Sequence, residues 1–126
     1  MNRVWAAAGL LAAVAGLCAF CLWYVHLSTD NLTAELETIT AALEREDRAV
    51  ALQETESARK NWKQGHAVLC MFLSHVQLAE VDRSLAALPA YITLGEIADG
   101  VAECGRIAEM VRHLRESELP LVQNIL

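Results

Sequence analysis

Proline and aromatic residues are scarce in this 126-residue chain. It holds two prolines, Pro89 and Pro120, 6% aromatic residues and few runs of β-branched residues. Aromatic and β-branched residues favour strands, and proline interrupts helices because it lacks a backbone N–H. The composition therefore argues against a strand-rich fold and predicts helix throughout.

Recognisable catalytic motifs are also missing. The sequence has no glycine-rich phosphate loop and no nucleophile elbow, and its 16 acidic residues are spread along the chain rather than paired beside an apolar pocket. We therefore expect no enzymatic activity. We assign no catalytic residue, no cofactor-binding residue, no metal ligand and no cofactor.

One long uncharged run is present, from Val4 to Val25. As a helix these residues span roughly 33 Å, which is enough for a hydrocarbon core of about 30 Å. A cleaved signal peptide is the alternative, with Ala13-Val14-Ala15 as the cleavage site, but cleavage there would leave an apolar N-terminus from Gly16. We predict a signal-anchor over residues 1–27, in contact with the bilayer through residues 4–25, and a domain over residues 28–126.

Charge predicts the orientation of this anchor. Arg3 precedes the run, and no basic residue follows it until Arg45, whereas acidic residues begin at Asp30. Because positive charge near a span stays in the cytoplasm, we expect a cytoplasmic N-terminus and an extracytoplasmic domain at the cell membrane. The part of the chain after Arg3 has a net charge of −7, against −6 for the whole sequence, so we expect no nucleic-acid partner.

Apolar residues at helical spacing form four stripes in the domain. The first continues the phase of Val25, so we expect the span to run unbroken into the first soluble helix. Four stripes predict an all-α fold, namely an N-terminal transmembrane helix followed by a small four-helix bundle or paired helical hairpins. The stripes are Leu32, Leu36, Ile39 and Leu43; Trp62, His66, Leu69, Leu73 and Val76; Leu78, Val81, Leu85, Leu88 and Ile92; and Ile97, Val101, Cys104, Ala108, Val111 and Leu114.

Local signals predict where these helices begin and end. Asp47 is a suitable N-cap for a helix from Arg48, and Asp82 for one that restarts after the polar stretch 74–80. Residues 93–96, Thr-Leu-Gly-Glu, match a capping box, and Pro89 should kink or end the third helix near Leu88. The apolar tail, residues 119–126, is expected to fold back on the bundle.

Two features predict a protein partner. Ala8, Ala12 and Gly16 form a small-x3-small row in the span, a pattern that lets two membrane helices approach closely. Beyond the span, the residues from Leu32 to Leu43 form a narrow apolar seam like that of a coiled coil, which could contact a partner helix. We therefore expect a protein partner or a homodimer, formed through the membrane helix and the first soluble helix.

The histidines and cysteines leave alternatives open. His66, His75 and His113, with Cys70 and Cys104, could form a metal cluster, but their spacing matches no zinc signature, and a lone histidine on an apolar helix face is more often structural. Cys70 and Cys104 could pair or could simply be buried. Cys18 and Cys21 lie in the span and are expected to act as small apolar residues.

Several spacings resemble a domain-of-unknown-function family of short bacterial proteins with one N-terminal span and an all-helical remainder. The resemblance covers essentially the whole chain, and it implies an envelope protein of spore-forming-type Gram-positive bacteria that works beside a polytopic membrane protein and has no assigned activity. Gln77 and Gln123 stand where the family has acidic residues, and the first change argues against a metal or acid–base role. The matching residues are Trp62-x3-His66-x2-Leu69-x2-Phe72-x2-His75, Asp82-x2-Leu85 and Glu116-Ser117-Glu118-x4-Gln123-Asn124-Ile125-Leu126.

These observations predict an uncharacterised membrane-anchored helical protein that acts as a protein-interaction or scaffolding module at the cell envelope. The alternative is an extracytoplasmic domain that senses a metal or small ligand through His66, His75 and His113.

Overall fold

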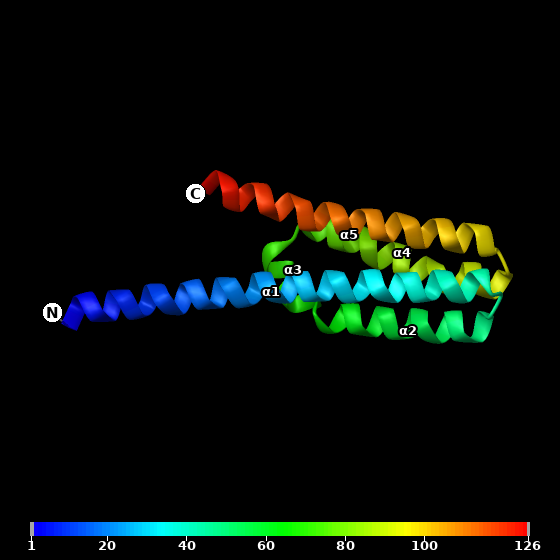
Figure 1. Ribbon diagram of the computed structural model, residues 1–126, viewed down its shortest axis with the longest axis horizontal. Coiled ribbons are helices and arrows are strands. Elements are labelled where there is room, and N and C mark those ends of the chain that lie inside the picture. Colours follow the sequence, from blue (N-terminus) through cyan, green and yellow to red (C-terminus); the bar gives the residue numbers. More distant parts are fainter. Residues whose placement is uncertain (1, 126) are drawn as a thin grey trace.

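The computed structural model of the protein describes residues 2–125, apart from the side chains of Phe72 and of residues 117–125. The described chain is all-α, as predicted, and contains no strand (Figure 1). Its helices are α1 (Asn2–Glu44), α2 (Arg48–Gln64), α3 (His66–Phe72), α4 (His75–Leu94) and α5 (Ile97–Ile125).

Helix α1 joins the apolar N-terminal run to the bundle without a break, which confirms the predicted continuity. Among the described residues it is the one helix long and apolar enough to cross a membrane. Residues 2–20 are exposed on every side, a length of roughly 28 Å, and burial begins at Cys21 and Val25. The bundle therefore holds α1 from before residue 28, where the domain was expected to begin.

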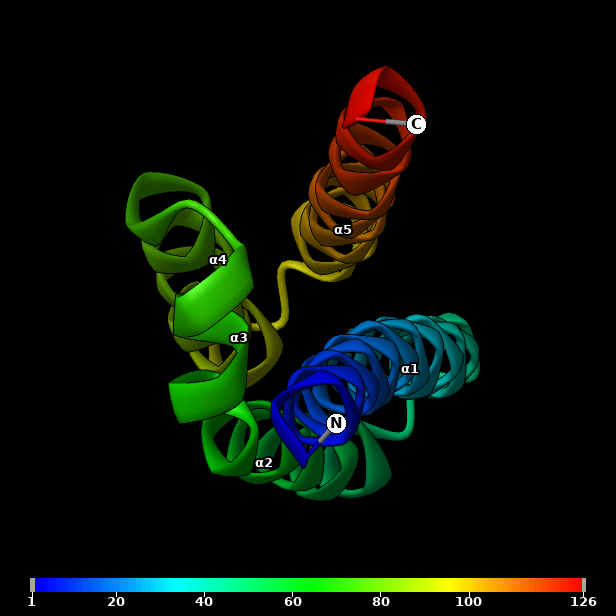
Figure 2. The ribbon, with the colours of Figure 1, turned by 90° about the vertical axis from the view of Figure 1, so that its left-hand side faces the viewer.

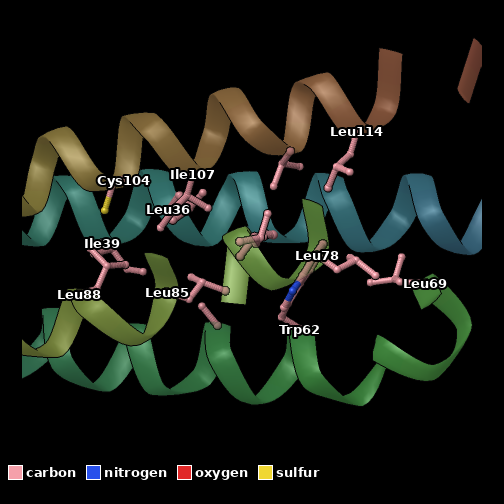
Figure 3. Close-up of a cluster of buried hydrophobic side chains, with 14 of the residues drawn as sticks. Leu36, Ile39, Trp62, Leu69, Leu78, Leu85, Leu88, Cys104, Ile107 and Leu114 are labelled. Carbon is pink, nitrogen blue, oxygen red and sulfur yellow. The ribbon is translucent and has the colours of Figure 1, made fainter. Parts of the chain in front are cut away.

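Four long helices surround the core. Helix α1 packs against α2 and α5, and α4 packs against the same two helices from the other side (Figures 1 and 2). This arrangement is the predicted four-helix bundle. Large side chains from all four helices meet between them, together with Leu69 of α3, and are fully or almost fully buried (Figure 3); they include Leu36, Ile39, Trp62, Leu78, Leu85, Leu88, Ile107 and Leu114.

The prediction that one helix carries the stripe from Trp62 to Val76 is wrong. Helix α2 ends before Gly65, α3 follows as a short separate helix, and Leu73 has an extended backbone with φ −109° and ψ 154°. Trp62, Leu69 and Leu73 are buried, but Val76 is 70% exposed on the first turn of α4. Hydrophobic spacing continues across Gly65 because the residues on both sides face the same core.

Asp47 caps α2 as predicted, because its carboxylate accepts a hydrogen bond from the Val50 N–H at 3.3 Å. The predicted helix start at Asp82 is wrong, since α4 begins at His75 and Asp82 lies well inside it. The stretch 74–80 is therefore mostly helix. Its polar residues are exposed, while Leu78 is buried.

The predicted capping box at residues 93–96 is also wrong, because these residues end α4 instead of starting α5. Gly95 has φ +76°, its N–H donates to the Ile92 carbonyl, and the Glu96 N–H donates to the Tyr91 carbonyl at 2.9 Å. This is the geometry of a left-handed helix C-cap, for which glycine is the preferred residue.

Helix α4 continues through Pro89 to Leu94, so the predicted end near Leu88 is wrong. An interior proline costs about 3 kcal/mol, and complete burial of Leu88 and Ile92 on either side offsets it. At the C-terminus, α5 continues to Ile125. The prediction that the tail packs on the bundle concerns side chains outside the described residues.

Candidate functional site

Three polar side chains form a hydrogen-bonded chain between α3 and α4. Cys70 Sγ lies 3.1 Å from His66 Nδ1, and His66 Nε2 lies 3.1 Å from Asp82 Oδ2. In the tautomer that carries its proton on Nε2, the imidazole donates to Asp82 and accepts from the Cys70 thiol. Sequence spacing alone suggested the His66–Cys70 pair but not Asp82, which comes from the next helix.

A thiol, an imidazole and a carboxylate in this order resemble an activated nucleophile. The side chains of His66 and Asp82 are about one-third exposed. The groove of about 300 Å³ beside Asp82 is lined by α2 and α4 residues such as Trp62 and Arg83, and neither Cys70 nor His66 lines it. The groove beside Asp82 therefore does not reach the thiol, and we interpret the three hydrogen-bonded side chains as a link that holds α3 against α4.

The structure does not bring His66, His75 and His113 together. Among the described residues, no group of three or more His, Cys, Asp or Glu side chains is arranged to hold a metal ion. His75 and His113 are exposed on α4 and α5, while both ring nitrogens of His66 already have partners. The alternative of a metal sensor built on these histidines therefore has no support in the geometry.

The two cysteines outside the span are both free and have different surroundings. Cys70 is partly exposed on α3, and Cys104 is buried on α5. Burial raises the pKa of the Cys104 thiol, a hydrogen bond with the Thr40 side chain opposes the rise, and the nearby Glu103 carboxylate adds to it. Cys104 is thus a small apolar core residue.

A polar groove of about 310 Å³ lies between α1 and α2. Trp62 and Glu35 line it, and Asn61 Nδ2 donates to Glu35 Oε1 at 3.3 Å. The other carboxylate oxygen of Glu35 and the Trp62 indole N–H are buried without a hydrogen-bond partner among the residues that the structure describes. Each of these two side chains has a polar group at the groove and an apolar part packed inside the bundle. The groove therefore reaches from the bundle surface to the edge of the core.

A second groove, of about 360 Å³, lies between α1 and α5. It is lined by Val111 and by four small residues, namely Thr29, Thr33, Gly105 and Ala108. A Cβ added to Gly105 would meet no atom within 4 Å, so the groove is open at this point. The sequence alone does not reveal this groove, because the groove forms between two helices that are far apart in the chain.

Charged pairs line the rim of the α1–α5 groove. Arg115 donates to the Asp30 carboxylate, and its Nε donates to His26 Nδ1 at 2.9 Å, which joins α5 to α1. Arg112 donates to Glu109 Oε2 at 2.7 Å within α5. These pairs balance one another, so the rim is polar without a strong excess of either sign.

Comparison with known proteins supplies a family and no activity. Residues 19–125 match the family described as domain of unknown function (DUF4363). The match starts just before Cys21, where α1 becomes buried, and leaves the first 18 residues outside it. No curated protein and no solved structure matches the chain. Because the match covers most of the sequence, the chain belongs to the DUF4363 family, whose function is unknown.

Proposed function

We propose that this protein is a single-pass membrane protein that binds a helix of another membrane protein along α1 and in the α1–α5 groove. It would act as an interaction or scaffolding module, with a cytoplasmic N-terminus and an extracytoplasmic bundle. The observation that supports this proposal is that the small-residue face of the span and the open groove lie on the same side of one continuous helix.

Helical geometry places these features in line. At 3.6 residues per turn, Ala8, Ala12 and Thr33 lie within about 60° of one another around the α1 axis, and Gly16 lies about 40° beyond Ala12. Ala8 and Ala12 belong to the exposed span, and Thr33 lines the groove. A partner helix that packs on the span would therefore meet the α1–α5 groove when it continues beyond the membrane.

Small residues favour a helix as the occupant. Membrane helices associate through close backbone approach, which alanine and glycine permit. Beyond the membrane, Gly105 and Ala108 of α5 continue this property beside α1. An antiparallel pair of helices with an open groove between them matches the shape of a third helix.

Charge favours a different protein over a second copy. The part of the chain after Arg3 has a net charge of −7, so two copies aligned in parallel would repel each other. A partner whose outer flank is neutral or basic would avoid this repulsion. We therefore propose a heteromeric complex with another membrane protein.

Site-specific photo-crosslinking in native membranes tests this proposal. A benzophenone amino acid at Ala12 and at Thr33 should capture the same partner, identified by mass spectrometry. Leu10 and Asn31 are matched controls, because both are exposed and both lie about 100° or more around the α1 axis from Ala8, Ala12 and Thr33. Equal capture at the control positions, or capture only of a second copy of this chain, would refute the proposed complex.

The proposed orientation has a separate test. Protease added to intact protoplasts should digest the bundle, because Arg3 stays inside and the acidic domain is outside. If residues 28–126 are protected until the membrane is disrupted, the orientation is reversed.

A further inference from the structure

We infer that the end of the bundle formed by α3 and the first turn of α4 is seated in the outer leaflet of the membrane that α1 crosses. The inference rests on the membrane anchor of the proposed function, and it adds a second lipid-binding surface to it. This surface comprises residues 64–79 and is called the proximal end below.

The proximal end lies where α1 leaves the bundle. Helix α3 is at the end of the bundle from which the N-terminal part of α1 projects, and it contacts α1 and α2 (Figure 1). Tyr24 packs over Gly65, because a Cβ added to Gly65 would lie 2.8 Å from the Tyr24 hydroxyl oxygen. Tyr24 follows Phe20 and Trp23, aromatic residues typical of the membrane–water interface. The bend at Gly65 is therefore level with the interface.

Formal charge is absent from this segment. Residues 64–79 contain no Asp, Glu, Lys or Arg, although such residues make up 21% of the whole chain. Its polar side chains are those of Gln64, Ser74 and Gln77, together with His66, Cys70 and His75. The cost of placing charge in lipid therefore does not oppose contact between the proximal end and the membrane.

The same segment exposes large apolar side chains. Beyond Leu27, the large hydrophobic residues exposed in the described part of the chain are Met71 at 74%, Val76 at 70% and Leu94 at 72%. Met71 and Val76 belong to the proximal end, whereas Leu94 lies at the opposite end of α4. Leu69 and Leu73 face the core, so the proximal end has apolar residues on its inner and outer sides.

A second segment approaches the membrane at the same end. Arg115 of α5 contacts His26 and Asp30 of α1, and the two helices run in opposite directions (Figure 1). Helix α5 continues beyond Arg115 to Ile125, so its last turns project from the same end of the bundle as the N-terminal part of α1 and diverge from it (Figures 1 and 2). Residues 119–126 contain no Asp, Glu, Lys or Arg.

Lipid is the occupant that these observations favour over protein. Met71 and Val76 are exposed at the end of the bundle from which the exposed apolar part of α1, residues 2–20, projects, beside uncharged polar residues at 74, 75 and 77. Any bilayer around the span reaches the level of Tyr24 and Gly65. The proximal end therefore meets lipid wherever α1 is inserted, without a further partner.

Photo-crosslinking to lipid tests the inference. The full chain is reconstituted in vesicles of palmitoyl-oleoyl phosphatidylcholine, with a diazirine amino acid at Met71, Val76, Leu94 or Leu17. We expect lipid adducts at Met71 and Val76 several-fold above those at Leu94, whose exposure matches theirs. Leu17 lies in the span and reports insertion of the anchor.

The outcomes separate the inference from the proposed function. Adducts at Leu17 with only the Leu94 level at Met71 and Val76 would overturn the inference and leave the anchor intact. Absence of adducts at Leu17 would overturn the anchor itself, and with it the inference.

Hydrogen exchange of a charged variant gives an independent measurement. Met71→Asp combined with Val76→Asp should fold normally in detergent because both residues are exposed. In vesicles it should lose amide protection over residues 66–78, while Leu94→Asp should not. Equal protection in the double variant and the unmodified chain would contradict seating in the leaflet.

Discussion

The two ends of the bundle share one core but have opposite surfaces. At the distal end, five consecutive charged residues, Glu44 to Arg48, lie at the turn from α1 to α2, and Glu96 lies in the turn from α4 to α5. At the proximal end, residues 64–79 have no formal charge. Both ends connect helices of the same bundle, so the helix connections themselves do not require the difference in charge. We interpret this difference as a response to the solvent around each end. Water solvates the distal turns, and the proposed leaflet solvates α3.

The core does not differ between the two ends as the surface does. Leu43, Leu88 and Ile92 near the distal end are as completely buried as Leu69 and Leu78 near the proximal end. Apolar burial therefore stabilises the whole length of the bundle. The two ends differ only in the charge of the segments that connect the helices, and we propose that this charge decides which end faces the membrane.

Trp62 should be the most sensitive residue of the proximal half. Its side chain is 3% exposed, so Trp62→Ala should cost about 3–5 kcal/mol out of the roughly 5–15 kcal/mol typical of a domain. Trp62→Phe should cost much less, because it keeps most of the ring volume and removes an indole N–H that has no hydrogen-bond partner in the described part of the chain. Chemical unfolding of the full chain in detergent, followed by circular dichroism, measures both. An unchanged midpoint for Trp62→Ala would show that this half is loosely packed.

Glycines at the two ends should respond for different reasons. Gly95, at the distal end, has φ +76°, so Gly95→Ala should cost about 1–2 kcal/mol. This cost comes from the backbone conformation and does not depend on how the neighbouring side chains rearrange. Gly65 has φ −89°, and the obstacles to a Cβ there are the Tyr24 hydroxyl oxygen at 2.8 Å and two Tyr24 ring carbons at 3.1 and 3.3 Å. Tyr24→Phe removes the nearest of these atoms, so it should relieve part of the loss of stability caused by Gly65→Ala but none of that caused by Gly95→Ala. A double-mutant cycle from thermal melts measures this coupling, and independence of Gly65 and Tyr24 would refute their contact.

Periodicity was sufficient to predict much of this fold. The spacing from Leu32 to Leu43 correctly continued the span into the bundle, since one helix needs only local information. Asp47 was identified as a cap for the same reason, because its carboxylate and the Val50 N–H are three residues apart. The position of this helix and of one N-cap could thus be predicted from residues close together in the sequence.

The features that escaped prediction depend on contacts between helices. The stripe through Gly65 kept its helical phase while the chain bent, so periodicity could not separate α2 from α3. Pro89 stayed inside α4 because neighbouring core residues hold the helix, and the His66–Asp82 contact joins residues 16 positions apart. The α1–α5 groove needs two helices from opposite parts of the sequence. Hydrophobic spacing describes each helix but not how neighbouring helices meet.

Gly105 separates stability from binding. Its replacement by alanine meets no atom within 4 Å, and alanine favours helix by about 1 kcal/mol over glycine, so Gly105→Ala should raise the stability of the isolated chain by up to that amount. The same methyl group should reduce partner capture by a crosslinker at Thr33, because it occupies the proposed groove. Thermal melts and crosslinking yields provide the two readouts. Greater stability with undiminished capture would show that the partner does not enter this groove.

Cys104 should produce the smallest effect, a change in stability at high pH. Burial raises the pKa of its thiol in the folded chain, so the unfolded chain loses this proton at a lower pH than the folded chain does. The free energy of unfolding should be unaffected by this group while both states are protonated. It should then fall as the pH rises from the unfolded pKa towards the folded one. Denaturant titrations across the alkaline range should show a weaker pH dependence for Cys104→Ala, which removes the thiol and leaves the other titrating groups in place. Equal slopes for the two proteins would show that the thiol ionises as easily in the folded core as in the unfolded chain, contrary to its burial between α5 and Thr40 of α1.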